Sequence, residues 1–120
     1  MERSEFEKLV REALSTIPEG LSAYLENVDL VVEDLPRNEH LGGHVIEDGD
    51  FLLGLYEGVP LTERSDYGMV LPDKITLFQK SIEGVCSSKE EIVQEVRGTV
   101  VHEVAHHFGI DDDRLDELKA

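Results

Sequence analysis

Cysteine, tryptophan and basic residues are scarce in this 120-residue sequence. It contains no tryptophan and a single cysteine, Cys86. A lone cysteine excludes an intramolecular disulfide and a cysteine-rich zinc cage, and it suits a reducing compartment. The first residues lack the basic and apolar regions of a secretory signal. We therefore expect a cytoplasmic protein.

Positive charge is also scarce, since 11 Lys and Arg stand against 27 Asp and Glu, a formal net charge of −16. Phosphates repel such a chain, so we expect neither nucleic acid nor an anionic membrane surface as a partner. No apolar run approaches the roughly 20 residues of a membrane span. Hydrophobic residues still make up 40%, which predicts one globular domain over residues 1–120.

The spacing of the hydrophobic residues predicts an N-terminal helix, several strands in the middle of the chain and a C-terminal helix. Strands are expected at residues 28–32, 51–56 and 74–79, and a short helix at 21–25. The connection over residues 57–73 is long for a compact domain, which often indicates function. The N-terminal helix ends before Pro18, and its apolar stripe consists of Phe6, Leu9, Val10, Ala13, Leu14 and Ile17.

The C-terminal helix is predicted to bury one face and to present the other to a cleft. Ser88 and Glu91 have the spacing of a capping box, and Gly109 stands where a left-handed C-terminal cap belongs. At about 100° per residue, one half of the helical wheel holds Ile92, Val93, Val96, Val100, Val104 and Phe108. The other half holds Glu95, Thr99, His102 and His106.

The open face carries the sequence His102-Glu103-Val-Ala-His106, an H-E-x-x-H motif. Two imidazoles one helical turn apart can reach the same metal ion, and Glu103 can reach a water that this metal activates. Two imidazoles and a carboxylate suit zinc better than magnesium or calcium. The motif therefore predicts one zinc ion per chain, with His102 and His106 as ligands and Glu103 as the general base of a hydrolysis.

The third ligand must come from outside the helix. Only 14 residues follow His106, so we do not expect a ligand from a distant downstream helix. Gly109 allows an early chain reversal, and the candidates after it are Asp111, Asp112, Asp113, Asp116 and Glu117. The three-residue step after Gly109 favours Asp112 and extends the motif to H-E-x-x-H-x-x-G-x-x-D.

The segment His102-Glu-Val-Ala-His-His-Phe-Gly-Ile-Asp-Asp-Asp-Arg-Leu115 resembles the signature of the small bacterial minimal-zincin metallopeptidases. The resemblance extends upstream through residues 53–64 and 72–79. It implies a zincin-like α+β fold, in which a small mixed sheet of three to four strands is combined with the N-terminal helix and the C-terminal zinc-binding helix. It also implies a zinc site and cleavage of peptide bonds in a peptide or protein substrate. By motif position, His102, His106 and Asp112 match the ligands of the family and Glu103 matches its catalytic base.

A peptidase site also needs a group that stabilises the oxyanion and a surface that binds the substrate backbone. Tyr67, in the long connection, is a candidate to stabilise the oxyanion of the reaction. Zincin clefts typically offer an edge strand to an extended substrate, and residues 74–79 are the strand expected in that role. His40 and His44, which flank two glycines, are interpreted as turn histidines near the surface.

Two alternative functions are also considered. His102, His106, Gly109 and Asp111 fall on the spacing of the H-G-x-L-H-L-x-G-Y-D-H signature of bacterial ribosomal-RNA maturation endoribonucleases. Glu103 replaces the glycine of that signature, however, and the net charge of −16 opposes RNA. The other alternative is a non-catalytic interaction protein with a structural zinc ion, against which Glu103 argues.

Overall fold

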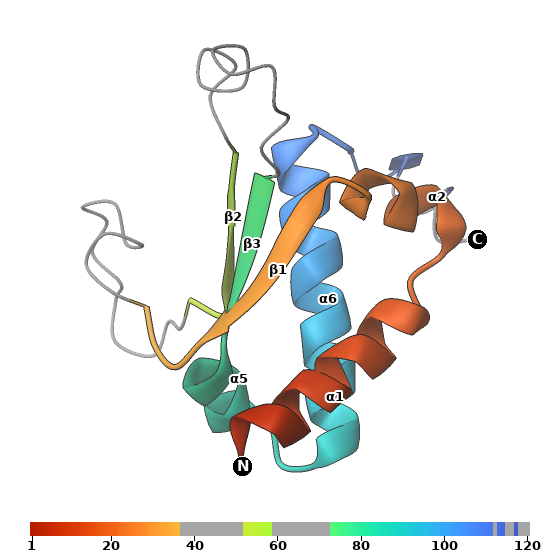
Figure 1. Cartoon of the computed structure of the whole chain (residues 1–120). Helices are drawn as coiled ribbons and strands as arrows, with labels where there is room; N and C mark the ends of the chain where they lie inside the picture. The colour runs from red at the N-terminus through yellow and green to blue at the C-terminus, as the bar shows by residue number, and fades with distance from the viewer. Residues whose placement is uncertain (37–51, 59–72, 112, 115–116, 118–120) are drawn as a thin grey trace.

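The computed structural model describes residues 1–36, 52–58, 73–111, 113–114 and 117, and Figure 1 shows the chain. None of the described helices combines the length and hydrophobicity needed to span a bilayer. The elements, in chain order, are α1 (Arg3–Ser15), α2 (Glu19–Ser22), the 3₁₀ helix η1 (Ala23–Leu25), β1 (Val28–Glu33), β2 (Gly54–Glu57), β3 (Asp73–Phe78), α5 (Gln79–Val85) and α6 (Lys89–His107).

The three described strands form a mixed sheet in the order β1-β3-β2. β3 runs parallel to β1, with Leu30 opposite Ile75, and antiparallel to β2, with Tyr56 opposite Ile75. Ile75, Thr76 and Leu77 have no exposed surface, as a strand covered on both faces requires. The α+β class and the mixed sheet predicted from the sequence are thus confirmed.

The position of β3 corrects one prediction. The strand expected at residues 74–79 was assigned to the substrate-binding edge, but β3 is paired on both sides and has no free edge. Its burial explains the error, because an almost unbroken apolar run is typical of a central strand. In the described part of the sheet, β2 is the outer strand next to α6.

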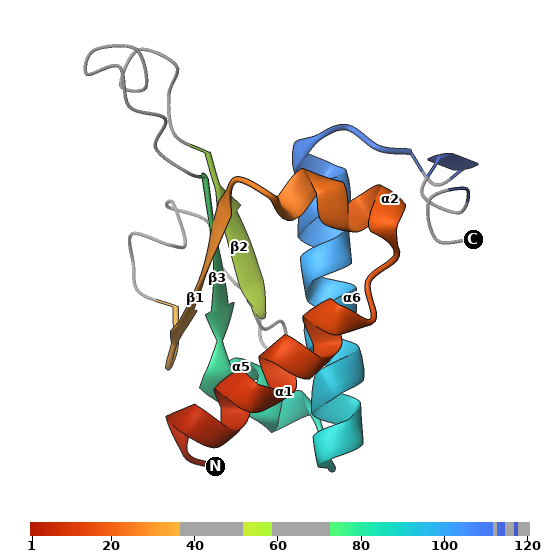
Figure 2. The same cartoon turned by 45° about the vertical axis from the view of Figure 1, so that its right-hand side comes forward.

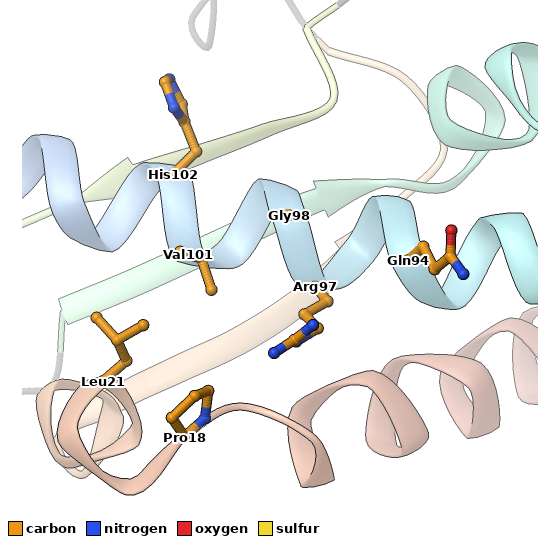
Figure 3. A pocket seen from close by; sticks show the side chains of 7 residues that line it. All are labelled: Pro18, Leu21, Gln94, Arg97, Gly98, Val101 and His102. Atoms are coloured by element: carbon orange, nitrogen blue, oxygen red, sulfur yellow. The ribbon is translucent and has the colours of Figure 1, made fainter. Parts of the chain in front are cut away.

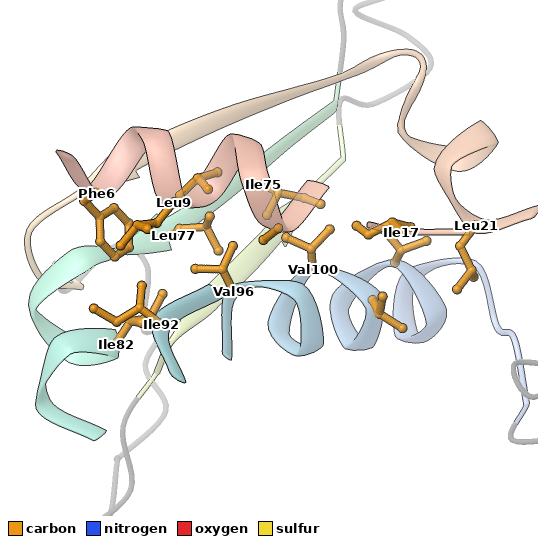
Figure 4. Packing of buried hydrophobic residues seen from close by; sticks show 14 residues of the cluster. Phe6, Leu9, Ile17, Leu21, Ile75, Leu77, Ile82, Ile92, Val96 and Val100 are labelled. Carbon is orange, nitrogen blue, oxygen red and sulfur yellow. The ribbon is translucent and has the colours of Figure 1, made fainter. Parts of the chain in front are cut away.

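Helices α1 and α6 lie together on one side of the sheet, which Figure 2 shows nearly edge-on. Figure 4 shows the side chains that fill the space between these layers. Each fully buried aliphatic or aromatic side chain contributes about 1.5–3 kcal/mol relative to exposure. The central residues of this core, all with no exposed surface, are Phe6, Ala13, Ile75, Leu77, Ile82, Val96 and Val100.

Helix α5 was not predicted, because its sequence has no apolar period and no capping residue. Gln79, expected as the last residue of a strand, begins this helix instead and is buried. The Nε of Arg3 donates to Oε1 of Gln79 at 2.6 Å, and its Nη1 donates to the carbonyl oxygen of Val32 at 2.7 Å. Contacts between segments far apart in the sequence therefore fix the turn from β3 into α5.

Candidate active site

Helix α6 begins and ends as the sequence predicts. The side chain of Ser88 accepts a hydrogen bond from the backbone N–H of Glu91 at 3.2 Å. At the other end Gly109 has a φ of 65°, and the N–H of Ile110 donates to the carbonyl oxygen of Ala105 at 2.8 Å. This 6→1 bond with a left-handed glycine is a Schellman motif. It turns the chain away from the helix immediately after the histidines.

The two faces of α6 differ in burial as expected, with a small shift of the apolar arc. Val93 is only half-buried and Phe108 is 43% exposed. Phe108 caps the helix instead of continuing it, and its ring packs against Tyr24 with 4.8 Å between ring centres. The residues that α6 buries are Ile92, Val96, Val100, Val101, Val104 and Ala105.

His102 and His106 are exposed on the opposite face, which confirms that they are not core residues. Their ring centres lie 6.3 Å apart and their planes differ by 50°. Zinc binds an imidazole nitrogen at about 2.1 Å, so two ligating rings have centres roughly 5–6 Å apart. Two exposed imidazole groups at this spacing fit one zinc ion after small side-chain rotations.

Glu103 lies between these histidines in the sequence and is half-buried. Burial raises the pKa of its carboxyl group above the ordinary value, while the nearby His102 and His106 lower it in part. A carboxylate with a raised pKa is a stronger base than an ordinary surface glutamate.

Two cavities flank Glu103 on the side of α6 that faces β2. One has a volume of about 330 Å³ and is lined by Leu52, Leu53, Gly54, Glu95, Gly98, Thr99, His102 and Glu103. The other has about 270 Å³ and is lined by Leu55, Tyr56, Glu103, His106 and His107. Glu103 is common to both, so it stands at the middle of a cleft between α6 and the outer strand β2.

Close contacts at both ends of β2 set the width of this cleft. A Cβ atom on Gly54 would lie 2.7 Å from Cγ2 of Thr99, so only glycine allows β2 to approach α6 there. At the other end, the rings of Tyr56 and His107 stack with 3.9 Å between their centres. The hydroxyl of Tyr56 donates to Oδ2 of Asp73 at 2.6 Å.

His107 forms part of the wall of this cleft. The structure places its ring against Tyr56, with Nε2 4.0 Å from Oδ2 of Asp73. Sequence reasoning missed Tyr56 and His107 as parts of the cleft wall, and the only signal for this wall was Gly54 inside a strand, which often indicates a close backbone approach.

A larger cavity of about 550 Å³ lies against α6 on the side of α2. Pro18, Leu21 and Arg97 contribute to its lining, and His102 lies at its rim. Figure 3 shows the imidazole of His102 pointing away from Pro18 and Leu21. Neither Glu103 nor His106 lines this cavity, but it shares Gly98 and His102 with the 330 Å³ cavity.

Several predicted residues fall outside the part of the chain that the structure describes. These are the third ligand Asp112, the oxyanion candidate Tyr67, and His40 and His44. The described residues contain no group of three or more potential metal ligands. Next to Asp112, Oδ1 of Asp111 accepts a hydrogen bond from the N–H of Arg114 at 2.8 Å. This bond has the i to i+3 spacing of a helix N-cap.

A mixed sheet with a helix behind it that presents an H-E-x-x-H histidine pair to a cleft is the arrangement of a zincin-like fold. The sequence model of the zincin-like metallopeptidase family matches residues 25–120 of this chain. Because this match covers most of the chain, the protein belongs to the zincin-like metallopeptidase family.

Among solved structures, the chain is similar to a conserved hypothetical protein from Thermo thermophilus. The two are 27% identical and superpose with a TM-score of 0.57, over 90% of this chain and 94% of the other. No curated protein matches the chain.

Proposed function

We propose that the protein is a zinc-dependent peptidase that hydrolyses peptide bonds with Glu103 as the general base. The observation that carries this proposal is the position of Glu103, half-buried between two cavities and next to His102 and His106. His102, His106 and Asp112 would hold the metal. A zinc ion in this position supplies Lewis acidity, which polarises the scissile carbonyl and activates water.

The remaining chemistry belongs to the residues of the chain. Glu103 accepts a proton from the attacking water and passes it to the leaving amine nitrogen, so that the products are a carboxylic acid and an amine, which exchange a proton to give a carboxylate and an ammonium group. Burial raises the pKa of this carboxyl group in the metal-free protein, which makes the group a stronger base than an ordinary carboxylate.

The substrate backbone binds next to β2 in this proposal. An extended peptide can add as a further strand to the outer strand of a sheet. Gly54 and Tyr56 hold β2 against α6, so a peptide added there would pass Glu103. Membership of a metallopeptidase family and the cleft along a strand both favour a peptide over RNA as substrate.

The substitution Glu103→Gln tests the mechanism. It preserves the shape and hydrogen bonding of the side chain but removes its basicity, so peptide hydrolysis should fall by ~10² or more. Zinc content, measured by elemental analysis after zinc incubation and desalting, should stay near one ion per chain. Unchanged turnover in this variant would remove Glu103 from the mechanism, and zinc content below about 0.2 per chain in the unaltered protein would contradict the metal site.

A further inference from the structure

The 330 Å³ cavity next to Glu103 contains a second carboxylate for which the proposed chemistry has no use. Glu95 lines this cavity together with His102 and Glu103. Glu95 precedes His102 by seven residues, so the two side chains leave α6 within about 20° of each other. The carboxylate therefore lies on the same stripe of the helix as the metal-binding histidines, about two turns towards the N-terminus.

Glu95 has no counter-charge in the described structure. Its side chain is half-buried and makes no hydrogen bond or ion pair with another described residue. The described residues that line the cavity include no lysine or arginine. The negative charge of Glu95 also acts on its surroundings: after burial, it is the next contribution that raises the pKa of Cys86. A half-buried carboxylate without a cationic partner among the described residues can bind a positively charged group of a ligand.

The walls of the cavity suit the apolar part of a long basic side chain. Leu52, Leu53 and Gly98 all line it. Apart from the chain neighbours and helix backbone of Gly98, no described atom lies within 4 Å of the position that its Cβ would take, so this part of the lining leaves space. Glu95 and Glu103 are eight residues apart, which places them roughly 12 Å apart along the helix axis. A lysine or arginine held near Glu103 can extend its methylene groups along this wall and bring its charge to Glu95.

We propose that the cavity between β2 and α6 is a substrate subsite for a lysine or arginine side chain, with Glu95 as the residue that binds its charge. This inference rests on the proposed peptidase function and specifies its substrate class. The net charge of −16 supports it, because a strongly acidic protein attracts basic peptides over long distances. Glu95 determines specificity here and takes no part in the proton transfers.

Hydrolysis of matched peptides tests the subsite. An acetylated peptide amide with one lysine is compared with the same peptide carrying norleucine, with the varied residue placed in turn on each side of the scissile bond. Wild-type kcat/KM should be about 10-fold or more higher for lysine on one of these sides. Glu95→Gln should abolish this preference and leave hydrolysis of the norleucine peptide within about 2-fold. Glu95→Lys should reverse it in favour of a glutamate-containing peptide.

A matched control removes the same charge outside the cavity. Glu90, exposed on the first turn of α6, is changed to Gln, and the preference for lysine should persist. Equal hydrolysis of the lysine and norleucine peptides by the wild type would overturn the inference, as would a preference that survives in Glu95→Gln.

A binding measurement separates failure of the subsite from failure of the proposed function. The zinc-loaded Glu103→Gln protein, titrated with the two peptides and followed by NMR, should bind the lysine peptide about 10-fold more tightly. Adding Glu95→Gln should remove the difference. If no peptide is hydrolysed by the wild type but this difference is found, the peptidase proposal fails and the subsite stands. If peptides are hydrolysed and the difference is missing, the subsite is wrong.

Discussion

On one face of α6, Val96 and Val100 are fully buried, whereas on the other His102 and His106 are exposed. The buried face contacts the sheet and α1, so its side chains contribute to the free energy of folding. The open face lines the cleft beside β2, where the exposed side chains of His102 and His106 are available to bind ligands. Substitutions on the buried face should therefore change the free energy of unfolding, and substitutions on the open face should change zinc binding. Four experiments test this separation.

The largest expected effect is that of His102→Ala on zinc binding. Loss of a metal ligand should weaken the affinity by more than the 10–100-fold typical of an outer-shell change, so we expect more than ~100-fold. Metal-free His102→Ala should unfold at the wild-type temperature, because the side chain is exposed. Competition titration against a chelator measures the affinity. His107→Ala, which changes the neighbouring histidine outside the motif, should keep zinc affinity within a few-fold.

On the buried face, Val100→Ala should lower the free energy of unfolding by about 2 kcal/mol, or about 30-fold in the folding equilibrium. The loss comes from buried methyl groups and the space they leave behind. Urea denaturation of the metal-free protein measures it, and the folded variant should bind zinc with wild-type affinity. Val93→Ala, at a half-buried position of the same helix, should lower the free energy of unfolding clearly less than Val100→Ala does. A large change in zinc affinity in Val100→Ala would show that the two faces are coupled.

Beyond the end of α6, Asp112→Ala should weaken zinc binding by at least ~10-fold. Asp111→Ala should leave zinc affinity nearly intact, because the Asp111 carboxylate caps the turn that contains Arg114. It should instead lower the stability of the metal-free protein by about 1 kcal/mol or less. If Asp111→Ala proves to be the damaging change for zinc and Asp112→Ala the silent one, the ligand assignment is wrong.

The smallest expected effect is on the pH dependence of stability. Because burial raises the pKa of Glu103 above 4.5, the folded metal-free protein binds this proton more tightly than the unfolded chain does. The contribution of this carboxyl group to the free energy of unfolding is therefore lost as pH rises from about 4.5 through the folded-state pKa. Metal-free Glu103→Gln should be more stable than the wild type at pH 7, and the difference should shrink towards pH 4. Thermal unfolding across this range measures it; a constant difference would mean that the carboxyl group does not titrate abnormally.

The N-terminal and C-terminal helices were predictable because each is specified by residues close together in the sequence. α1 and α6 have apolar residues at helical spacing, and Ser88 and Gly109 mark the ends of α6 by local hydrogen bonding and backbone conformation. The histidine pair follows from the same regularity, since residues four apart share a helix face. Within the sheet, local signals predicted that β3 is a strand but not that it is central.

The sequence by itself determined the chemistry of the site: two imidazoles and a carboxylate on consecutive turns of one helix. Tertiary structure alone decided what faces them. The pairing order that makes β2 the outer strand, the approach allowed by Gly54 and the stacking of Tyr56 on His107 all join segments that lie far apart in the printed sequence. Local propensity carries no information about such pairings, because their free energy depends on the packing of whole elements against each other. The half-burial of Glu103, which raises its pKa, is a product of the same packing.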